Sequence, residues 1–356
     1  MQRTNWKQFA QSPWPKFSAA FLILFTFYLL ARDTHPPVSK YHDLLTTTNT
    51  SALVHQGTSR LVRMLEANEK RYQFTIAERE KLILKSGGYD IPAFPPPFTA
   101  LYVLWDFFIP AFTCPFPMYR VGVLADGGKW VCGLDRVLQN RPNPIVYSLN
   151  HQTSPYSSFE QDMLSRSPGC QIYGFDANAT KAATAQWPWG DTAVVTDFKL
   201  LSRVHFNHFA VADLKAERYR SLHDVMRGFG HRWIDILKID LEGSEFATLV
   251  SIIADTQDEP LPFGQLLLEV HIGWSADMTT VDQFSKWFAR LERAGLRPFY
   301  FEVSMLDVNT MRSEPAVVYV GDQNHLTSFV TDVRQWSFIN IRGRHALVDD
   351  GLPEYP

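Results

Sequence analysis

The sequence predicts an α/β protein built around a mostly parallel β-sheet, and three observations support this. Residues 234–239 form an almost unbroken apolar run, which is typical of a strand buried on both faces of a parallel sheet. The run ends at Asp240 and Glu242, and candidate strands alternate with helical patterns along the rest of the chain. Another candidate strand ends in Asp176, so acids are expected at the carboxyl edge, where α/β sheets bind ligands.

Each element has its own local signal. Helices are expected to begin at Ser157 and Ser221, each with an acid three residues later, and at Ser244 after the central strand. A later helix with a period of three to four apolar residues is expected to end at Gly295. Short apolar segments bounded by turn residues predict strands at 143–150, 171–176, 205–213, 233–240, 265–271 and 299–305, with the last strand at either 316–320 or 336–341.

Composition narrows the class of protein. With 356 residues and 46% hydrophobic content, the chain is long enough for one large domain with a sizeable core. A net charge of −3 gives no reason to expect a nucleic acid partner. Three cysteines are too few for a disulfide scaffold and lack metal-ligand spacing. One bridge is compatible with them, and we favour Cys114 with Cys132, which leaves Cys170 as a thiol.

The N-terminal region predicts a single-pass type II membrane protein. Residues 17–31 are apolar and uncharged, although shorter than the roughly 20 residues of a typical span. Basic residues within 1–16 place that tail in the cytosol and the remainder in the lumen of the Golgi or endoplasmic reticulum. A cleaved signal peptide is the alternative, but small residues are not evident at the cleavage positions after Leu30. Glycosylation sequons begin at Asn49 and Asn178, and Asn49 is the better candidate.

The remaining chain divides by composition. Residues 32–90 are expected to form a stem that contains a charged helix over 59–85. Residues 91–117 are rich in proline and aromatic residues, too apolar for a free linker, and are expected to wrap the domain as an ordered belt. The catalytic domain is then expected over 118–356.

Asp176 has a specific physical use at the end of the second candidate strand. In nucleotide-binding sheets a carboxylate there accepts hydrogen bonds from the ribose hydroxyls, while the first strand-to-helix turn holds the rest of the ligand. That first turn, 150–155, lacks the usual glycines, but Asn150 tolerates positive φ. The alternative for Asp176 is a purely local role as a loop-capping residue.

A set of short motifs carries a resemblance. Together they resemble the membrane-anchored methyltransferase-like protein 24 family, a relative of the FkbM-type S-adenosylmethionine-dependent methyltransferases, over about residues 119–341. The combination of KIDLEGSE with GFDAN is the most specific part, and WSFIN alone carries no weight. In chain order the motifs are DGGKWVCG (126–133), YSLN with SSFE (147–160), YGFDAN (173–178), LKIDLEGSEF (237–246), LLLEVHIGW (267–274) and WSFIN (336–340).

The resemblance implies a class I, Rossmann-like methyltransferase fold. Such a fold has a seven-stranded sheet, with six parallel strands and an antiparallel last hairpin, and helices on both faces. The implied cofactor is S-adenosylmethionine. By position, the turn containing Tyr147, Ser148 and Asn150 faces its methionine part, Asp176 its ribose and Asp213 its adenine.

The resemblance also places Asp240 beside the methyl group and the substrate. Because the sulfonium methyl is already activated, transfer to an alcohol mainly needs positioning and removal of the hydroxyl proton. His271 is a candidate base near neutral pH, and it shares a strand face with Glu269. Together with the two acids that end the central strand, the candidate catalytic residues are Asp240, His271 and Glu242. Alternatively, Asp240, Glu269 and His271 hold a divalent metal ion, or Glu269 and His271 form a buried structural pair.

Three functions are compatible with the sequence. The first is a lumenal methyltransferase acting on a glycan or other hydroxyl acceptor. The second is a Golgi glycosyltransferase, since anchor, stem and globular domain are the layout of that class, although the acid ending the second strand fits a methyltransferase better. The third is an inactive methyltransferase-fold binding module, which the replacement of a usual glycine by Asn150 favours.

Overall fold

The computed structural model describes residues 59–97, 100–124, 127–151, 156–181, 185, 187–190, 197–212, 218–303 and 333–351. All of them belong to one compact unit within residues 50–356. Within the described ranges, every helix is too short or too polar to cross a membrane. The expected anchor at 17–31, Asn49, Asp213 and the candidate strand at 316–320 lie outside the described residues.

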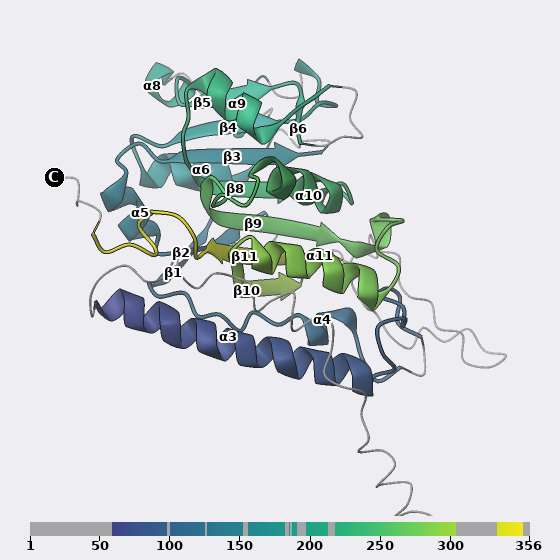
Figure 1. The fold of residues 1–356 in the computed structure, drawn as a ribbon. Coiled ribbons are helices and arrows are strands. Elements are labelled where there is room, and N and C mark those ends of the chain that lie inside the picture. The colour runs from purple at the N-terminus through teal and green to yellow at the C-terminus, as the bar shows by residue number, and fades with distance from the viewer. Residues whose placement is uncertain are drawn as a thin grey trace, which may run out of the picture. The chain divides into compact units, whose positions relative to one another are not determined.

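A seven-stranded mixed sheet forms the centre, in the order β10-β11-β9-β8-β3-β4-β5 (Figure 1). β11 runs antiparallel to both of its neighbours, and the other adjacent pairs are parallel. This is the mixed sheet that the resemblance implies. The strands are β3 (Ile145–Asn150), β4 (Gln171–Phe175), β5 (Val204–Asn207), β8 (Ile234–Asp240), β9 (Phe263–His271), β10 (Leu296–Val303) and β11 (Val333–Asn340).

Two parts of the strand prediction differ from the structure. The strand expected at 205–213 is split, because β5 ends at Asn207 and the chain leaves the sheet before β6 (Ala210–Val211), which pairs with β7 (Tyr219–Arg220). Ala212 then has a φ of 56°, a left-handed conformation that ends an extended strand. The sequence also did not predict the antiparallel hairpin of β1 (Met118–Val121) and β2 (Lys129–Cys132).

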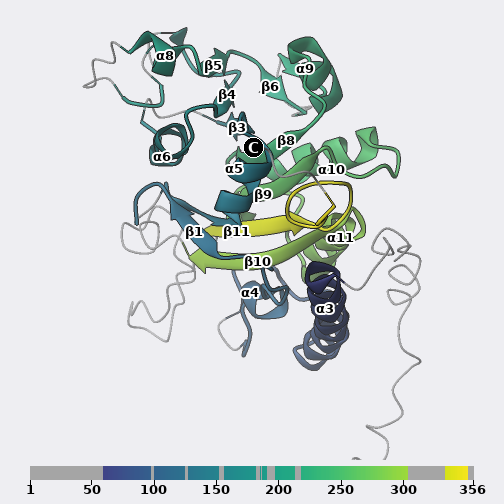
Figure 2. The same cartoon turned by 90° about the vertical axis from the view of Figure 1, so that its left-hand side faces the viewer.

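Helices cover both faces of the sheet (Figure 2). α9, α10 and α11 lie on one face, and α5, α6 and the β1–β2 hairpin lie on the other (Figures 1 and 2). β8 is buried from both sides, since Leu237 packs in one core cluster and Ile236 in the other. The helices are α3 (Arg60–Lys85), α4 (Leu104–Phe107), α5 (Leu134–Asn140), α6 (Ser158–Arg166), α8 (Phe198–Leu201), α9 (Leu222–Phe229), α10 (Glu245–Asp255), the short 3₁₀ turn η2 (Ile272–Trp274) and α11 (Val281–Arg293).

The helix starts were predicted correctly, but only one cap has the expected bond. Ser221 caps α9, because its Oγ accepts from the backbone N–H of Asp224 at 3.1 Å. Ser157 precedes α6 without a side-chain cap, since its hydroxyl donates to the carboxylate of Glu160 instead. Ser244 likewise precedes α10 without a side-chain cap bond. In both cases a neighbouring glutamate takes part in tertiary contacts.

The segments before β1 are integral to the domain. The expected helix is observed as α3, and Arg297 of β10 reaches it through a 2.7 Å ion pair with Glu69. Most of the described aromatic residues of the belt are buried, as expected for an ordered wrapping segment, and these include Trp105, Phe107, Phe108 and Phe112. The expected disulfide between Cys114 and Cys132 is present, and Cys170 is a buried free thiol.

Candidate active site

Polar side chains end three adjacent strands at the carboxyl edge of the sheet. Asn150 at the end of β3 pairs in register with Asp240 at the end of β8. Asp176 follows β4, the neighbour of β3 on the other side, and is buried. Because all three strands are parallel, their carboxyl ends meet at one edge, which is where ligands bind in such sheets.

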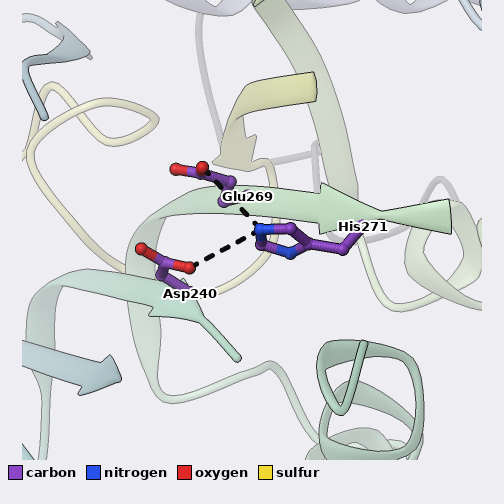
Figure 3. Close-up of side chains that lie close together, drawn as sticks. All are labelled: Asp240, Glu269 and His271. Atoms are coloured by element: carbon purple, nitrogen blue, oxygen red, sulfur yellow. Dashed lines mark ion pairs between the residues drawn. The ribbon is translucent and has the colours of Figure 1, made fainter. Parts of the chain in front are cut away.

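The structure brings together three of the sequence-predicted site residues, Asp240, Glu269 and His271 (Figure 3). The imidazole Nε2 of His271 lies 3.9 Å from Asp240 Oδ1 and 3.8 Å from Glu269 Oε1. Glu269 and His271 are both buried and come from β9, whereas Asp240 comes from β8. The histidine therefore faces two carboxylates at once.

A lysine from the unpredicted hairpin completes this cluster. Lys129 of β2 places its Nζ 2.8 Å from Glu269 Oε2 in a buried ion pair. Burial by itself would raise the pKa of Glu269, but the Lys129 ammonium outweighs it and lowers that pKa below its usual range. Glu269 is therefore ionised under ordinary conditions.

The pKa of Asp240 is shifted in the opposite direction, upward. Burial among the surrounding atoms, followed by the negative charge of Glu269, raises the pKa of Asp240 to about 6. Because 36% of the Asp240 side chain is exposed, solvent weakens the effect of burial on its pKa. The negative charge of Glu269 still raises the pKa of Asp240. Asp240 is thus the carboxylate of this pair that takes up a proton first as the pH falls.

His271 is held by a third acid. Its backbone N–H donates to Glu245 Oε1 at 2.6 Å, and its Nδ1 lies 3.5 Å from the same oxygen, within ion-pair distance but outside hydrogen-bond geometry. Burial opposes the imidazolium, but Glu245, Asp240 and Glu269 together raise the pKa of His271 to about 9. The imidazole therefore carries a positive charge at neutral pH.

A second buried polar network lies beside this cluster at the start of the first turn. Glu160 of α6 accepts from Ser148 Oγ at 2.6 Å and from Lys238 Nζ at 3.1 Å. Asn150 folds back so that its Nδ2 donates to the carbonyl oxygen of Ser148 at 3.1 Å. Burial would raise the pKa of Glu160, but the Lys238 charge and the hydroxyl donors lower it. The Ser148 hydroxyl is therefore engaged within the protein.

Tyr147 and Asp176, two other predicted cofactor-binding residues, lie in different surroundings. The Tyr147 side chain is buried on the opposite face, where its hydroxyl lies 2.7 Å from His231 Nδ1. Asp176 Oδ1 accepts from the backbone N–H groups of Asn178 and Ala179 at 2.8 and 3.2 Å, so it caps its own loop. This local role is compatible with a ligand role, since a carboxylate has several acceptor positions.

Glu242 lies apart from the cluster. Its Oε2 is 2.8 Å from His151 Nδ1, and both side chains are about a third exposed. The two turns after β3 and β8 are also joined by the backbone, because His151 N–H donates to the carbonyl oxygen of Asp240 at 3.1 Å. Glu242 thus connects two loops at the edge rather than facing His271.

The cluster can be tested as a metal site. One donor atom each from Asp240, Glu269 and His271 lie within 4.8 Å of one another, a spread compatible with a single ion. The surroundings fit such an ion poorly, because one Glu269 oxygen already binds Lys129, whose positive charge would repel a second cation at close range. The donor set is therefore better matched to the protein's own cations.

Sequence reasoning did not identify Lys129, Lys238, Glu160 or Glu245 as parts of the site. The position of Lys238 in the sequence could have indicated its role. A lysine inside an apolar strand that is buried on both faces needs a buried partner of opposite charge. For Glu160 the sequence predicts only a capping box, in which an acid follows three residues after a serine. Lys129 lies in the DGGKW motif, but only the fold places it near Glu269.

Comparison with known proteins identifies the family. A family model for a methyltransferase domain matches residues 99–317. Probable methyltransferase-like protein 24 of Rattus norvegicus is 30% identical over 141 residues, which cover 37% of this chain and 36% of that protein. The Homo sapiens protein of the same name is 29% identical over 164 residues, which cover 44% of this chain and 42% of that protein. The chain thus spans less than half the length of these curated relatives.

Two solved fibrillarin structures are also similar, at low levels. The Methanococcus jannaschii fibrillarin pre-rRNA processing protein has a TM-score of 0.33 and 9% identity, covering 58% of this chain and 70% of that one. Aeropyrum pernix fibrillarin with natively bound S-adenosyl-L-methionine has a TM-score of 0.30 and 11% identity, covering 63% and 83%. TM-scores of this size support no functional argument.

The family match therefore rests on sequence. The matched residues span β1 to β10, including the Asp240, Glu269 and His271 cluster. The resemblance to methyltransferase-like protein 24 that the motifs indicate is confirmed by both curated relatives. The chain belongs to the methyltransferase-domain family.

Proposed function

We propose that this protein is an S-adenosylmethionine-dependent O-methyltransferase that acts on a glycan or another hydroxyl acceptor in the lumen of the secretory pathway. The observation that carries the proposal is the placement of Asp240 and His271 together at the carboxyl edge of the sheet. The family is established, whereas the cofactor, the acceptor and the compartment are parts of the proposal.

Residues at the strand ends fit the proposed cofactor. Asp176 offers a buried carboxylate at the strand end where ribose hydroxyls are bound in related folds, and Asn150 lies at the adjacent strand end. The hydroxyls of Tyr147 and Ser148 already have protein partners, so these two residues would shape the site rather than donate to the ligand. Bound S-adenosylmethionine would supply an activated methyl group.

The chain's own chemical contribution is to take a proton from the acceptor hydroxyl. Asp240 is suited to this role, since it is partly exposed and its raised pKa of about 6 makes it a stronger base than an ordinary aspartate. His271 is cationic at neutral pH, because its pKa is raised to about 9 by its acidic neighbours. We therefore assign the base role to Asp240 and give His271 the role of orienting it.

The proposed location rests on separate observations. The disulfide between Cys114 and Cys132 suits an oxidising compartment such as the secretory pathway. The apolar segment 17–31 and the basic residues before it agree with a single-pass type II anchor. A lumenal domain would meet glycans and other hydroxyl compounds as acceptors.

Calorimetry on the detergent-solubilised full chain tests the proposal. We expect saturable binding of S-adenosylmethionine, and transfer of a labelled methyl group to a lumenal glycan fraction. Binding of nucleotide sugars without S-adenosylmethionine would instead indicate the glycosyltransferase alternative. Absence of binding by either compound would indicate the inactive module.

A further inference from the structure

Lys129 reaches the candidate active site from a rigid part of the fold. β2 is fixed to the sheet by Gln265, which accepts from Cys132 N–H at 2.8 Å and donates to Cys132 O at 3.0 Å. The hydroxyl of Ser337 donates to the carbonyl oxygen of Trp130 at 2.8 Å. Cys132 is also tied to Cys114 by the disulfide. Contacts with Gln265, Ser337 and Cys114 therefore fix the backbone of the strand that carries Lys129.

The fixed backbone of β2 places the Lys129 ammonium group next to the acidic side chains of the cluster. Lys129 Nζ lies 2.8 Å from Glu269 Oε2, and the side chains of the pair are 5% and 11% exposed. The other oxygen of Glu269, Oε1, is the one that faces His271 Nε2 at 3.8 Å. Lys129 thus fixes which way the Glu269 carboxylate is turned.

A cation of the protein already lies beside this cluster. A divalent ion placed among Asp240, Glu269 and His271 would meet the Lys129 ammonium group at close range. The groups that face the cluster are Lys129 from β2, Lys238 and Asp240 from β8, Glu269 and His271 from β9, and Glu245 from α10, with Glu160 of α6 paired to Lys238.

We propose that Lys129 is a positioning residue whose ammonium group is the resident cation of the Asp240, Glu269 and His271 cluster, in the place that a divalent metal ion would otherwise take. The inference deepens the proposed function, because it concerns the same site. It makes methyl transfer by this chain independent of a metal and dependent on the DGGKW motif.

The inference predicts a gain of metal binding when the ammonium is removed. In the Lys129→Met chain, Asp240, Glu269 and His271 retain their donor atoms but lose the competing cation. We expect Mn²⁺ to bind this variant at least about tenfold more tightly than the wild type, since a positive charge next to the ion has been removed. Calorimetry with Mn²⁺ on the full chain in detergent, at neutral pH, measures this directly.

Matched variants assign any binding to the cluster. Lys129→Arg keeps the positive charge and should bind Mn²⁺ no better than the wild type. The Lys129→Met and Glu269→Gln double variant removes both charges of the pair and should lose the gained binding. A general loosening of the fold would not produce this pattern, because it would not be reversed by Arg or by loss of Glu269.

Two results would overturn the inference. One is a wild-type chain that binds Mn²⁺ saturably and loses that binding in Glu269→Gln, a comparison that holds even if Lys129→Met does not fold. The other is a folded Lys129→Met chain with unchanged Mn²⁺ affinity. Neither measurement uses S-adenosylmethionine or an acceptor, so failure here is distinct from failure of the proposed methyltransferase activity.

Discussion

Arg79 of α3 and Glu292 of α11 form a buried ion pair across 213 residues of sequence, with 2.8 Å between Arg79 Nη2 and Glu292 Oε1. The hydroxyl of Tyr72, about two turns earlier in α3, donates to the same Glu292 oxygen at 2.6 Å. α3 lies before the residues matched by the methyltransferase-domain family. It is nevertheless fixed to the domain by the buried ion pair between Arg79 and Glu292.

Loss of one partner of this pair should therefore destabilise the whole domain. We expect Arg79→Met to lower the free energy of unfolding by about 3–5 kcal/mol, because the Glu292 charge is left buried without its cation. Lys81→Met, which breaks the exposed pair with Glu78, is the control and should cost less than about 1 kcal/mol. Chemical denaturation measures both. Equal effects of the two substitutions would show that α3 is not anchored in this way.

Asp240→Asn should abolish most turnover while sparing the fold. The substitution keeps size and hydrogen-bonding capacity but removes the base, so the rate should fall by about 10² or more, and S-adenosylmethionine affinity should change little. In the wild type, turnover should also fall as the pH drops through about 6, where Asp240 becomes protonated. A melting temperature that drops together with an unchanged rate would mean that Asp240 has only a structural role.

Stability should depend on pH through His271. Its pKa is raised in the folded protein from 6.5 to about 9, so the folded state binds the proton more tightly than the unfolded state. The resulting stabilisation is fully present below about pH 6.5 and is lost as the pH rises through about 9. Melting temperatures measured across this range should fall for the wild type and stay flatter for His271→Gln. Parallel curves would refute the assignment.

Asp176→Ala should weaken S-adenosylmethionine binding by about 1.5–3 kcal/mol, since hydrogen bonds to a charged acceptor are lost. Because Asp176 also caps its loop through Asn178 and Ala179, some loss of stability is expected as well. Asp176→Asn separates the two effects, because its amide oxygen can keep the loop bonds while the charge is lost. If calorimetry gives wild-type affinity for both variants, Asp176 does not bind the ribose.

Gly243 should tolerate no side chain. It has a φ of 97°, and a Cβ added there would lie 2.8 Å from the carbonyl oxygen of Trp274 in η2. Gly243→Ala therefore combines backbone strain with a clash against backbone and should cost about 2–4 kcal/mol. Gly230 has a φ of 73° with nothing within 4 Å, so Gly230→Ala measures strain alone and should cost about 1–2 kcal/mol. Unfolding experiments that rank the two equally would contradict the close contact.

The sequence by itself determined the central parallel strands of this domain and the edge at which its candidate site lies. The apolar run before Asp240 specified a strand buried on both faces, since alternation is lost only when both sides are covered. Because parallel strands present their carboxyl ends at one edge, the positions of Asp176, Asp240 and His271 in their strands were enough to predict a shared site.

Tertiary structure alone decided the charge state of that site. Lys129 meets Glu269 across 140 residues, and a contact of that sequence separation has no local signature. The raised pKa of His271 depends on Glu245, a helix residue whose sequence context predicts only helix formation. Local propensity and periodicity report how a segment folds, whereas a pKa depends on which charges from other segments come within a few ångströms. The choice of Asp240 over His271 as the base therefore followed only from the folded arrangement.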